Sequence, residues 1–143
     1  MNDATAGDYN LFMKIRDPSR PGLQVLCMVN KGYEYTYHHP WKGFEYYLLA
    51  AKIVLQKYDA MFVVGGTGPM MPYLKKLAEK LRISKNIVFT GFIPLHDLYA
   101  ILYQVADIAV STSLKEQFPS YILEIMAAGK PIVATSVAGV PEQ

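Results

Sequence analysis

Two carboxylates in the segment EQFPSYILE could bind one ligand together. Glu116 and Glu124 stand eight residues apart, with a proline and two aromatic residues between them. A carboxylate accepts hydrogen bonds and repels phosphate, so such a pair suits neutral hydroxyl groups of the kind that sugars carry. Glutamate pairs are common and most are simply solvated, so the spacing alone favours two surface charges.

Pro119 predicts where the helix that carries Glu124 begins. Proline cannot lie inside a helix but suits its first turn. The amides at that end, expected to be those of Phe118, Ser120 and Tyr121, have no helical acceptor and form a site for an anion. At about 1.5 Å of rise per residue, Glu124 lies roughly 7 Å along from that end, which is about the distance between the terminal phosphate and the ribose of a nucleoside diphosphate.

The helical wheel predicts which side of this helix packs on the core. The expected core stripe is formed by Ile122, Ile125 and Met126, flanked by Tyr121 and Leu123. Ser120 and Glu124, four residues apart, share the opposite face. Glu116 precedes the helix and lies in the loop that leaves the preceding strand.

The rest of the sequence alternates short apolar runs with amphipathic segments. Strands are predicted at 23–29, 60–66, 86–92, 107–113 and 131–135. Helical spacing of apolar residues predicts helices between them, marked by Phe44, Leu48, Ala51, Leu55 and Tyr58, then by residues 71–81, then by 98–105. This pattern indicates an α/β, Rossmann-like parallel sheet with helices on both faces, which binds ligands beyond the carboxyl ends of its strands.

Composition limits the class of protein. The 143 residues carry a net charge of +2 and are 52% hydrophobic, which excludes disorder and gives no sign of nucleic-acid binding. The single cysteine, Cys27, cannot form an internal disulfide, and no signal peptide or membrane span is visible, so we expect a cytoplasmic domain. Residues 1–22 are interpreted as a leader or linker and 23–143 as one incomplete lobe, truncated at its C-terminal end because no helix follows the last strand.

The segment EQFPSYILEIMAAGKPIVAT resembles the Glu-x7-Glu motif of retaining glycosyltransferases of the GT-B fold, the large family-four group. The resemblance covers about residues 23–142 and implies the carboxyl-terminal lobe, which binds a nucleotide-diphosphate sugar donor. It implies that Glu124 binds the ribose hydroxyls and that Glu116 is the catalytic-site residue that contacts the transferred sugar. The backbone of Phe118, Pro119, Ser120 and Tyr121 would hold phosphate and sugar.

The family also places a basic pair after its first strand, usually an Arg and then a Lys in a Lys-Gly pair. Lys42 matches the second member and is assigned to the donor diphosphate. Lys31 is the nearest candidate for the first, but it replaces a guanidinium fork by a point charge. The departure concerns one contact of the expected donor site.

Three further residues are assigned to the donor site by the same resemblance. Gly66 lies in the glycine-rich turn after the second strand, where a structural role near the donor is favoured. The backbone around Phe92 and Ile93 corresponds to the turn that meets the nucleotide base. Residues 111–115 lead into Glu116 and either line the sugar pocket or form a solvated loop.

The resemblance implies no cofactor and no metal, and His38 and His39 lack partners at ligand spacing. The expected partners are the donor and an N-terminal acceptor lobe, in cis or in trans, which would also be the route to any peripheral membrane association. The isolated lobe is expected to bind donor weakly and to transfer nothing. The alternative is a non-catalytic donor-binding or regulatory subunit of a split transferase, while an epimerase of the same architecture ranks lower because it lacks the glutamate motif.

Overall fold

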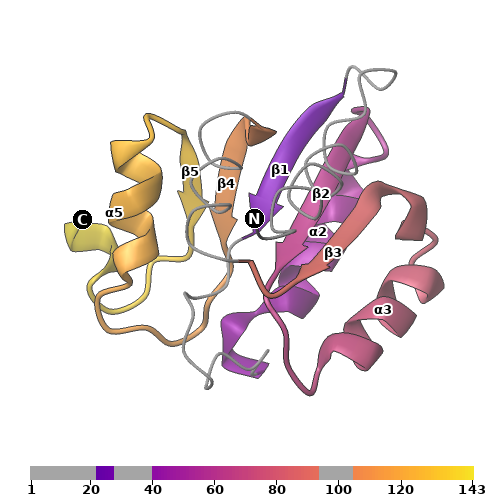
Figure 1. Ribbon diagram of the computed structural model, residues 1–143, viewed down its shortest axis with the longest axis horizontal. Helices are drawn as coiled ribbons and strands as arrows, with labels where there is room; N and C mark the ends of the chain where they lie inside the picture. The colour runs from indigo at the N-terminus through magenta and orange to yellow at the C-terminus, as the bar shows by residue number, and fades with distance from the viewer. Residues whose placement is uncertain (1–21, 28–39, 94–104) are drawn as a thin grey trace, which may run out of the picture.

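The computed structural model describes residues 22–27, 40–93 and 105–143 of the chain. They form one parallel sheet with the strand order β3-β2-β1-β4-β5 (Figure 1). The strands are β1 (Leu23–Cys27), β2 (Ala60–Gly65), β3 (Ile87–Gly91), β4 (Ile108–Ser111) and β5 (Ile132–Ala134). The predicted Rossmann-like sheet is confirmed.

Three α-helices lie within the described ranges: α2 (Phe44–Val54), α3 (Met71–Lys80) and α5 (Ser120–Ala127). Short 3-10 helices occupy Pro40–Lys42, Ser84–Asn86 and Val140–Glu142. The helix predicted at 98–105 and the expected leader at 1–22 lie outside the described residues, except for Gly22 and Val105.

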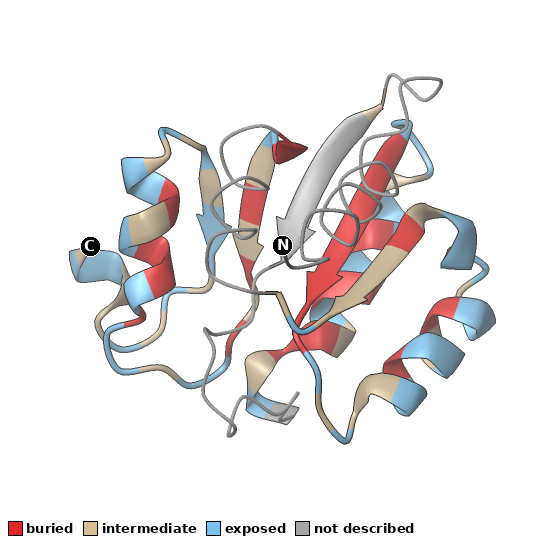
Figure 2. Ribbon diagram, viewed as in Figure 1, coloured by how far each residue is buried: buried red, intermediate tan, exposed pale blue. Residues whose placement is uncertain are grey.

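Alternate residues of β2 separate the two faces of the sheet. Phe62 and Val64 pack in one buried cluster with residues of α2 and α3. Val63, between them, packs in a second cluster with residues of α5. Because neighbouring side chains of a strand point to opposite faces, α2 and α3 cover one face and α5 covers the other. Figure 2 shows the buried side of α5 turned toward β4 and β5.

The inner face of α2 differs in part from the expected stripe. Phe44, Leu48 and Ala51 are buried as predicted, but the helix ends at Val54, and Tyr58 is exposed beyond it. Tyr47, which the sequence left outside the stripe, is buried instead. Its hydroxyl donates a 3.3 Å hydrogen bond to the Val63 carbonyl oxygen, so the polar end of the ring has a partner inside the core.

The α5 helix begins one residue later than predicted, with Pro119 as its N-cap in an extended conformation. Ile122 and Ile125 are buried as expected, whereas Met126 is 48% exposed, so its place in the core stripe was wrong. Tyr121 takes that place and is only 3% exposed. A helical wheel assumes that a helix packs on a wide surface. The α5 helix has only eight residues and buries a narrower stripe, which includes Tyr121 and not Met126.

The strand order reverses between β1 and β4. Chain order runs outward from β1 through β2 to β3, and then returns to β4 on the other side of β1. In open α/β sheets, the loops on either side of such a reversal leave in opposite directions and open a crevice at the carboxyl ends of the strands. The segment before α2 and the segment after β4 therefore meet at this crevice.

Candidate functional site

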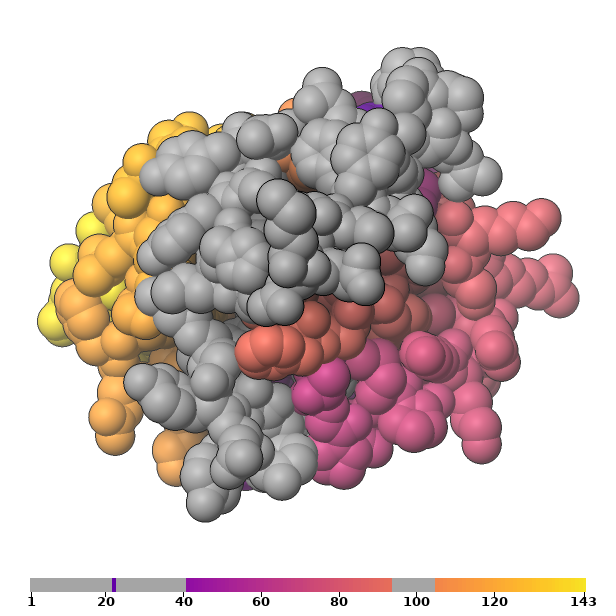
Figure 3. Space-filling view, in the orientation of Figure 1, coloured from indigo at the N-terminus to yellow at the C-terminus, as the bar shows by residue number. Residues whose placement is uncertain are grey.

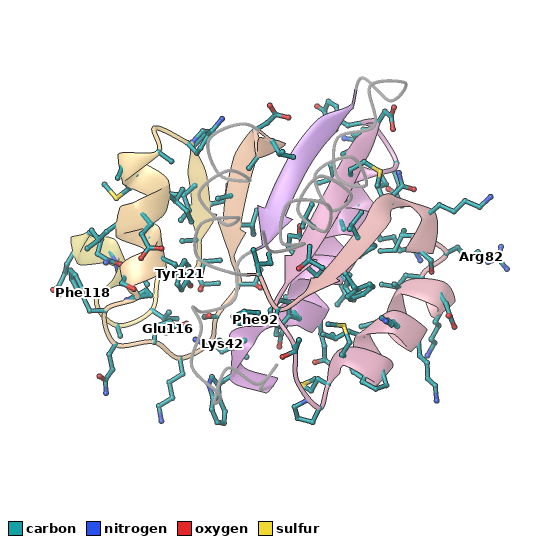
Figure 4. The ribbon with its side chains drawn as sticks, in the orientation of Figure 1. Lys42, Arg82, Phe92, Glu116, Phe118 and Tyr121 are labelled. Atoms are coloured by element: carbon teal, nitrogen blue, oxygen red, sulfur yellow. The ribbon has the colours of Figure 1, made fainter. Side chains whose placement is uncertain are left out.

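The segments on either side of the crevice bring Lys42 and Glu116 together. Lys42 ends the 3-10 helix before α2, and Glu116 lies between β4 and α5. The Lys42 Nζ donates to the Glu116 Oε1 at 2.5 Å, and the two side chains are 13% and 11% exposed. Figure 4 shows both side chains at the lower edge of the sheet, with Arg82 at the opposite side of the molecule. One positive and one negative group are thus held side by side in a largely shielded place.

Glu116 accepts a second hydrogen bond on the same oxygen. The Ser113 Oγ donates to the Glu116 Oε1 at 2.7 Å, and Ser113 is only 4% exposed. The Ser113 carbonyl oxygen in turn accepts a hydrogen bond from the Thr135 Oγ1, beyond the end of β5. The loop that carries Glu116 is therefore tied to both neighbouring strands.

Gly43 allows the two segments to approach one another closely. Its φ is +68°, and a Cβ added there would lie 1.9 Å from the Thr112 carbonyl oxygen. On either side of this contact, the Leu114 amide donates to the Trp41 carbonyl oxygen at 2.6 Å and the Thr112 Oγ1 donates to the Lys42 carbonyl oxygen at 3.4 Å. Lys42 reaches Glu116 because the residue after it has no side chain.

A buried hydrogen bond fixes α5 to the end of β4. The Ser111 and Tyr121 hydroxyl oxygens lie 2.5 Å apart, and both residues are about nine-tenths buried or more. The bond joins the last residue of the strand to the first turn of the helix. It therefore sets where the amino end of α5 lies relative to the crevice.

Replacing Tyr121 by phenylalanine should lower the free energy of unfolding by about 1–3 kcal/mol, because the buried Ser111 hydroxyl loses its partner while the ring is kept. Urea denaturation measures this difference. Tyr58→Phe is the matched control, since Tyr58 is 64% exposed, and a surface change of this kind should stay within about 0.5 kcal/mol. Equal stabilities of the two variants would contradict a structural role for the bond.

The amino end of α5 lies next to the C-terminal turn of the described chain. The Gly139 amide donates to the Gln117 carbonyl oxygen at 2.9 Å, and the Gln143 Nε2 donates to the Pro119 carbonyl oxygen at 3.2 Å. Phe118 is 55% exposed and Pro119 is buried. Since the first amides of a helix have no acceptor within it and carry the positive end of its dipole, this end remains suited to an anion.

Glu124 lies one turn further along α5 from Ser120. Its side chain is half-buried, and its Oε2 is shielded from solvent. Ser120 is exposed, so the two residues that were predicted to share a face differ in their exposure to solvent. A shielded carboxylate oxygen on the helix that points its amino end into the crevice is consistent with the predicted hydroxyl-binding role, which stays a prediction.

A hollow of about 240 Å³ opens beside the ion pair. It is lined by Trp41, Lys42, Lys115, Glu116 and Gln117, which come from both segments of the crevice. The hollow therefore combines an exposed aromatic side chain with two lysines and the shielded carboxylate of Glu116.

The other assigned residues that the structure describes directly follow the carboxyl ends of β2 and β3. The Gly66 amide, at the end of β2, donates to the Gly91 carbonyl oxygen at 2.8 Å, as expected of a structural turn. Phe92 is 57% exposed, and Ile93 is partly buried against the cluster that contains α5. Their contacts with a donor stay predictions, and Lys31 lies outside the described residues.

Within residues 22–27, 40–93 and 105–143, no group of three or more His, Cys, Asp and Glu side chains is arranged to hold a metal ion. None of the helices in the same ranges combines the length and the apolarity that a membrane crossing requires.

The sequence placed Glu116, Lys42 and the start of α5 at one edge, but it did not predict that Lys42 bonds to Glu116. It named residues 111–115 as pocket lining or loop, without the hydrogen bonds of Ser111 and Ser113. For Thr135 the sequence predicts only the end of a strand. Short polar residues that directly follow two adjacent parallel strands are the signal that could have found this network.

The model of the family described as glycosyl transferases group 1 matches residues 37–143, well over half of the chain. The chain belongs to this family. An uncharacterized glycosyltransferase of Methanocaldococcus jannaschii is 40% identical over 101 residues, which make up 71% of this chain and 26% of that protein. The chain spans about a quarter of the length of the curated relatives it matches.

Solved structures share the fold. The C-terminal domain of a glycosyl transferase group 1 family protein from Francisella tularensis matches with a TM-score of 0.69 and 28% identity, over 88% of this chain and 65% of that one. The Anabaena protein HepE, solved in complex with UDP-glucose, matches with a TM-score of 0.67 and 22% identity, over 93% of this chain and 35% of that one. The fold is that of the carboxyl-terminal domain of GT-B glycosyltransferases.

Proposed function

We propose that the chain is the donor-binding lobe of a retaining glycosyltransferase and binds a nucleotide-diphosphate sugar at the crevice between β1 and β4. The observation that carries this proposal is the Lys42–Glu116 pair, which places an ammonium and a carboxylate in contact beside the amino end of α5. A ligand that fits both must carry negative charge directly next to neutral hydroxyl groups. A sugar joined to a diphosphate has this pattern.

The two side chains have bonding capacity left for such a ligand. An ammonium has three N–H donors, and one of those of Lys42 is used by Glu116. The other two can bind phosphate oxygens, together with the first amides of α5. Glu116 uses Oε1 for Lys42 and Ser113, so Oε2 is the atom that would accept a hydroxyl of the transferred sugar.

Glu124 supplies the third part of the proposed site. It lies roughly 7 Å along α5 from the phosphate-binding end, at about 1.5 Å per residue, where a ribose would follow the diphosphate. The Anabaena neighbour, whose solved complex contains UDP-glucose, has the same fold over most of this chain, which supports a nucleotide sugar as the ligand class. The sugar and the base are left open by the proposal.

In the proposed reaction, the sugar is transferred to the face from which the diphosphate leaves, and the departing phosphate oxygen helps to deprotonate the acceptor. Lys42 and the amino end of α5 stabilise the charge that develops on the diphosphate, and Glu116 orients the sugar. No metal or other cofactor is invoked, because these groups already offset the charge. The acceptor would lie on a separate N-terminal lobe, consistent with the share of its relatives' length that this chain spans.

Direct titration of the chain with UDP-glucose, GDP-mannose and ADP-glucose tests the proposal by calorimetry. One lysine, a helix end and a few amide hydrogen bonds should supply roughly 5–8 kcal/mol, the scale of millimolar to micromolar dissociation constants. Glu124→Gln should weaken binding of the preferred donor by about tenfold, since a charged acceptor becomes neutral.

The matched control is Glu79→Gln on the outer side of α3, which should bind like the unchanged chain. The lobe alone should transfer no sugar, because catalysis also needs a positioned acceptor. Saturable binding of none of the three donors would overturn the proposal.

A further inference from the structure

We infer that Ser113 is a positioning residue: it fixes the carboxylate plane of Glu116, so that the site distinguishes a sugar-bearing nucleotide from the bare nucleoside diphosphate. The inference rests on the proposed function and deepens it. It begins from the two hydrogen bonds on the Glu116 Oε1, one from Lys42 at 2.5 Å and one from Ser113 at 2.7 Å.

A single partner would leave the carboxylate group free to turn. The last torsion of a glutamate side chain has a broad, roughly two-fold profile, so one hydrogen bond from a donor that can itself move lets the oxygen and the plane of the group turn together. The ammonium of Lys42 accepts many orientations of the carboxylate because its three donors rotate about the side-chain axis. Ser113, which approaches the same oxygen from within its own loop, removes this freedom.

Ser113 is itself held in place. It is 4% exposed, which restricts the positions that its hydroxyl can take. Its carbonyl oxygen accepts a hydrogen bond from the Thr135 Oγ1, and the Thr135 amide donates to the Ser111 carbonyl oxygen at 3.0 Å. The position of the serine is thus set by β4 and by the residue that directly follows β5.

The orientation of the carboxylate plane decides where the Glu116 Oε2 points. With both donors on Oε1, no side chain of the described ranges bonds to Oε2, and its direction is fixed by the plane of the carboxylate. Diphosphate binding involves Lys42 and the amino end of α5, and does not need that plane. Ser113 should therefore affect the part of the affinity that the sugar contributes and leave the nucleotide part unchanged.

The test compares matched ligand pairs on the unchanged chain and on Ser113→Ala. The pairs are UDP with UDP-glucose, GDP with GDP-mannose and ADP with ADP-glucose, and the measured quantity is the ratio of the two dissociation constants within the pair that binds best. Ser113→Ala should reduce the gain from the sugar about three- to tenfold, while the affinity for the bare diphosphate stays within about twofold. Ser113→Thr, which keeps the hydroxyl, should restore most of the gain.

Two variants separate positioning from a general effect. In a Glu116→Ala background, Ser113→Ala should add less than about twofold, because the carboxylate that it orients is gone. Ser84→Ala, at an exposed serine after α3, should leave both affinities unchanged.

Each outcome decides the inference. If the unchanged chain binds a nucleotide sugar and Ser113→Ala keeps the full gain from the sugar, the positioning role is wrong and the proposed function stands. An equal loss for bare diphosphate and sugar nucleotide, or an unchanged effect in the Glu116→Ala background, shows a merely structural role and also overturns it. If the unchanged chain binds none of the six ligands, the proposed function fails and the inference fails with it.

Discussion

Lys42→Met should weaken binding of the preferred nucleotide sugar by about 10- to 150-fold, the equivalent of roughly 1.5–3 kcal/mol for a charge-assisted hydrogen bond. The bare nucleoside diphosphate should lose the same factor, because Lys42 is proposed to act on the phosphates. The change should also lower the free energy of unfolding by about 1–3 kcal/mol, since the shielded Glu116 carboxylate would lose its cationic partner. Calorimetry and urea denaturation measure the two effects.

The pattern across ligands distinguishes Lys42 from its neighbour in the pair. Glu116→Gln should reduce only the gain from the sugar, whereas Lys42→Met should reduce binding with and without the sugar. Lys76→Met, on the exposed side of α3, removes the same charge far from the crevice and should change neither affinity nor stability. A Lys42→Met chain that bound the bare diphosphate as tightly as the unchanged chain would contradict the assignment of Lys42 to the phosphates.

Gly43→Ala should lower the free energy of unfolding by about 2–5 kcal/mol. A left-handed backbone costs an alanine about 1–2 kcal/mol, and forced overpacking commonly adds about 1–3 kcal/mol. The added Cβ would lie 1.9 Å from a backbone oxygen, that of Thr112, so one of the two segments must move. Because Lys42 precedes Gly43, the displacement should also separate Lys42 from Glu116 and weaken donor binding. Urea denaturation and calorimetry test both statements.

Gly129 offers a matched control. Its φ of +67° is almost the same as that of Gly43, but a Cβ added at this position after α5 would meet no atom within 4 Å. Gly129→Ala should therefore cost only the conformational term, about 1–2 kcal/mol. If the two substitutions lower the free energy of unfolding equally, the close approach at Gly43 adds nothing to the cost of the substitution there.

The sheet could be predicted from the sequence because its strands are buried on both faces. A strand such as β2 is apolar at every position, and a helix such as α3 repeats its apolar residues at helical spacing, so element type and order follow from local pattern. Figure 3 shows α3 and the turn after it at the right edge with long protruding side chains, as the polar outer face of such a helix should have. Met126 and Tyr58 were misplaced because a wheel assumes a full helix on a wide surface, whereas α5 is short and α2 ends early.

The chemistry of the site was also visible in part. Glu116 and Glu124 stood out by residue type, but their spacing alone favoured two surface charges, and the roles of Glu116, Glu124 and Lys42 were implied by the resemblance to the glycosyltransferase motif. The pairing could not be predicted, since Lys42 and Glu116 are 74 residues apart in the sequence. Their contact depends on the return of the chain to β4 beside β1, and on how closely Gly43 lets the two segments approach.

The sequence by itself determined the parallel α/β sheet and its ligand-binding edge, because these follow from apolar periodicity, and its resemblance to a known motif implied which residues do chemistry there. Only the tertiary structure decided that Lys42 binds Glu116, that Ser113 shares the same oxygen and that Tyr121 anchors α5 to Ser111. Hydrogen bonds depend on distances of a few tenths of an ångström and on direction. Such distances arise from the packing of distant segments, which no local pattern encodes.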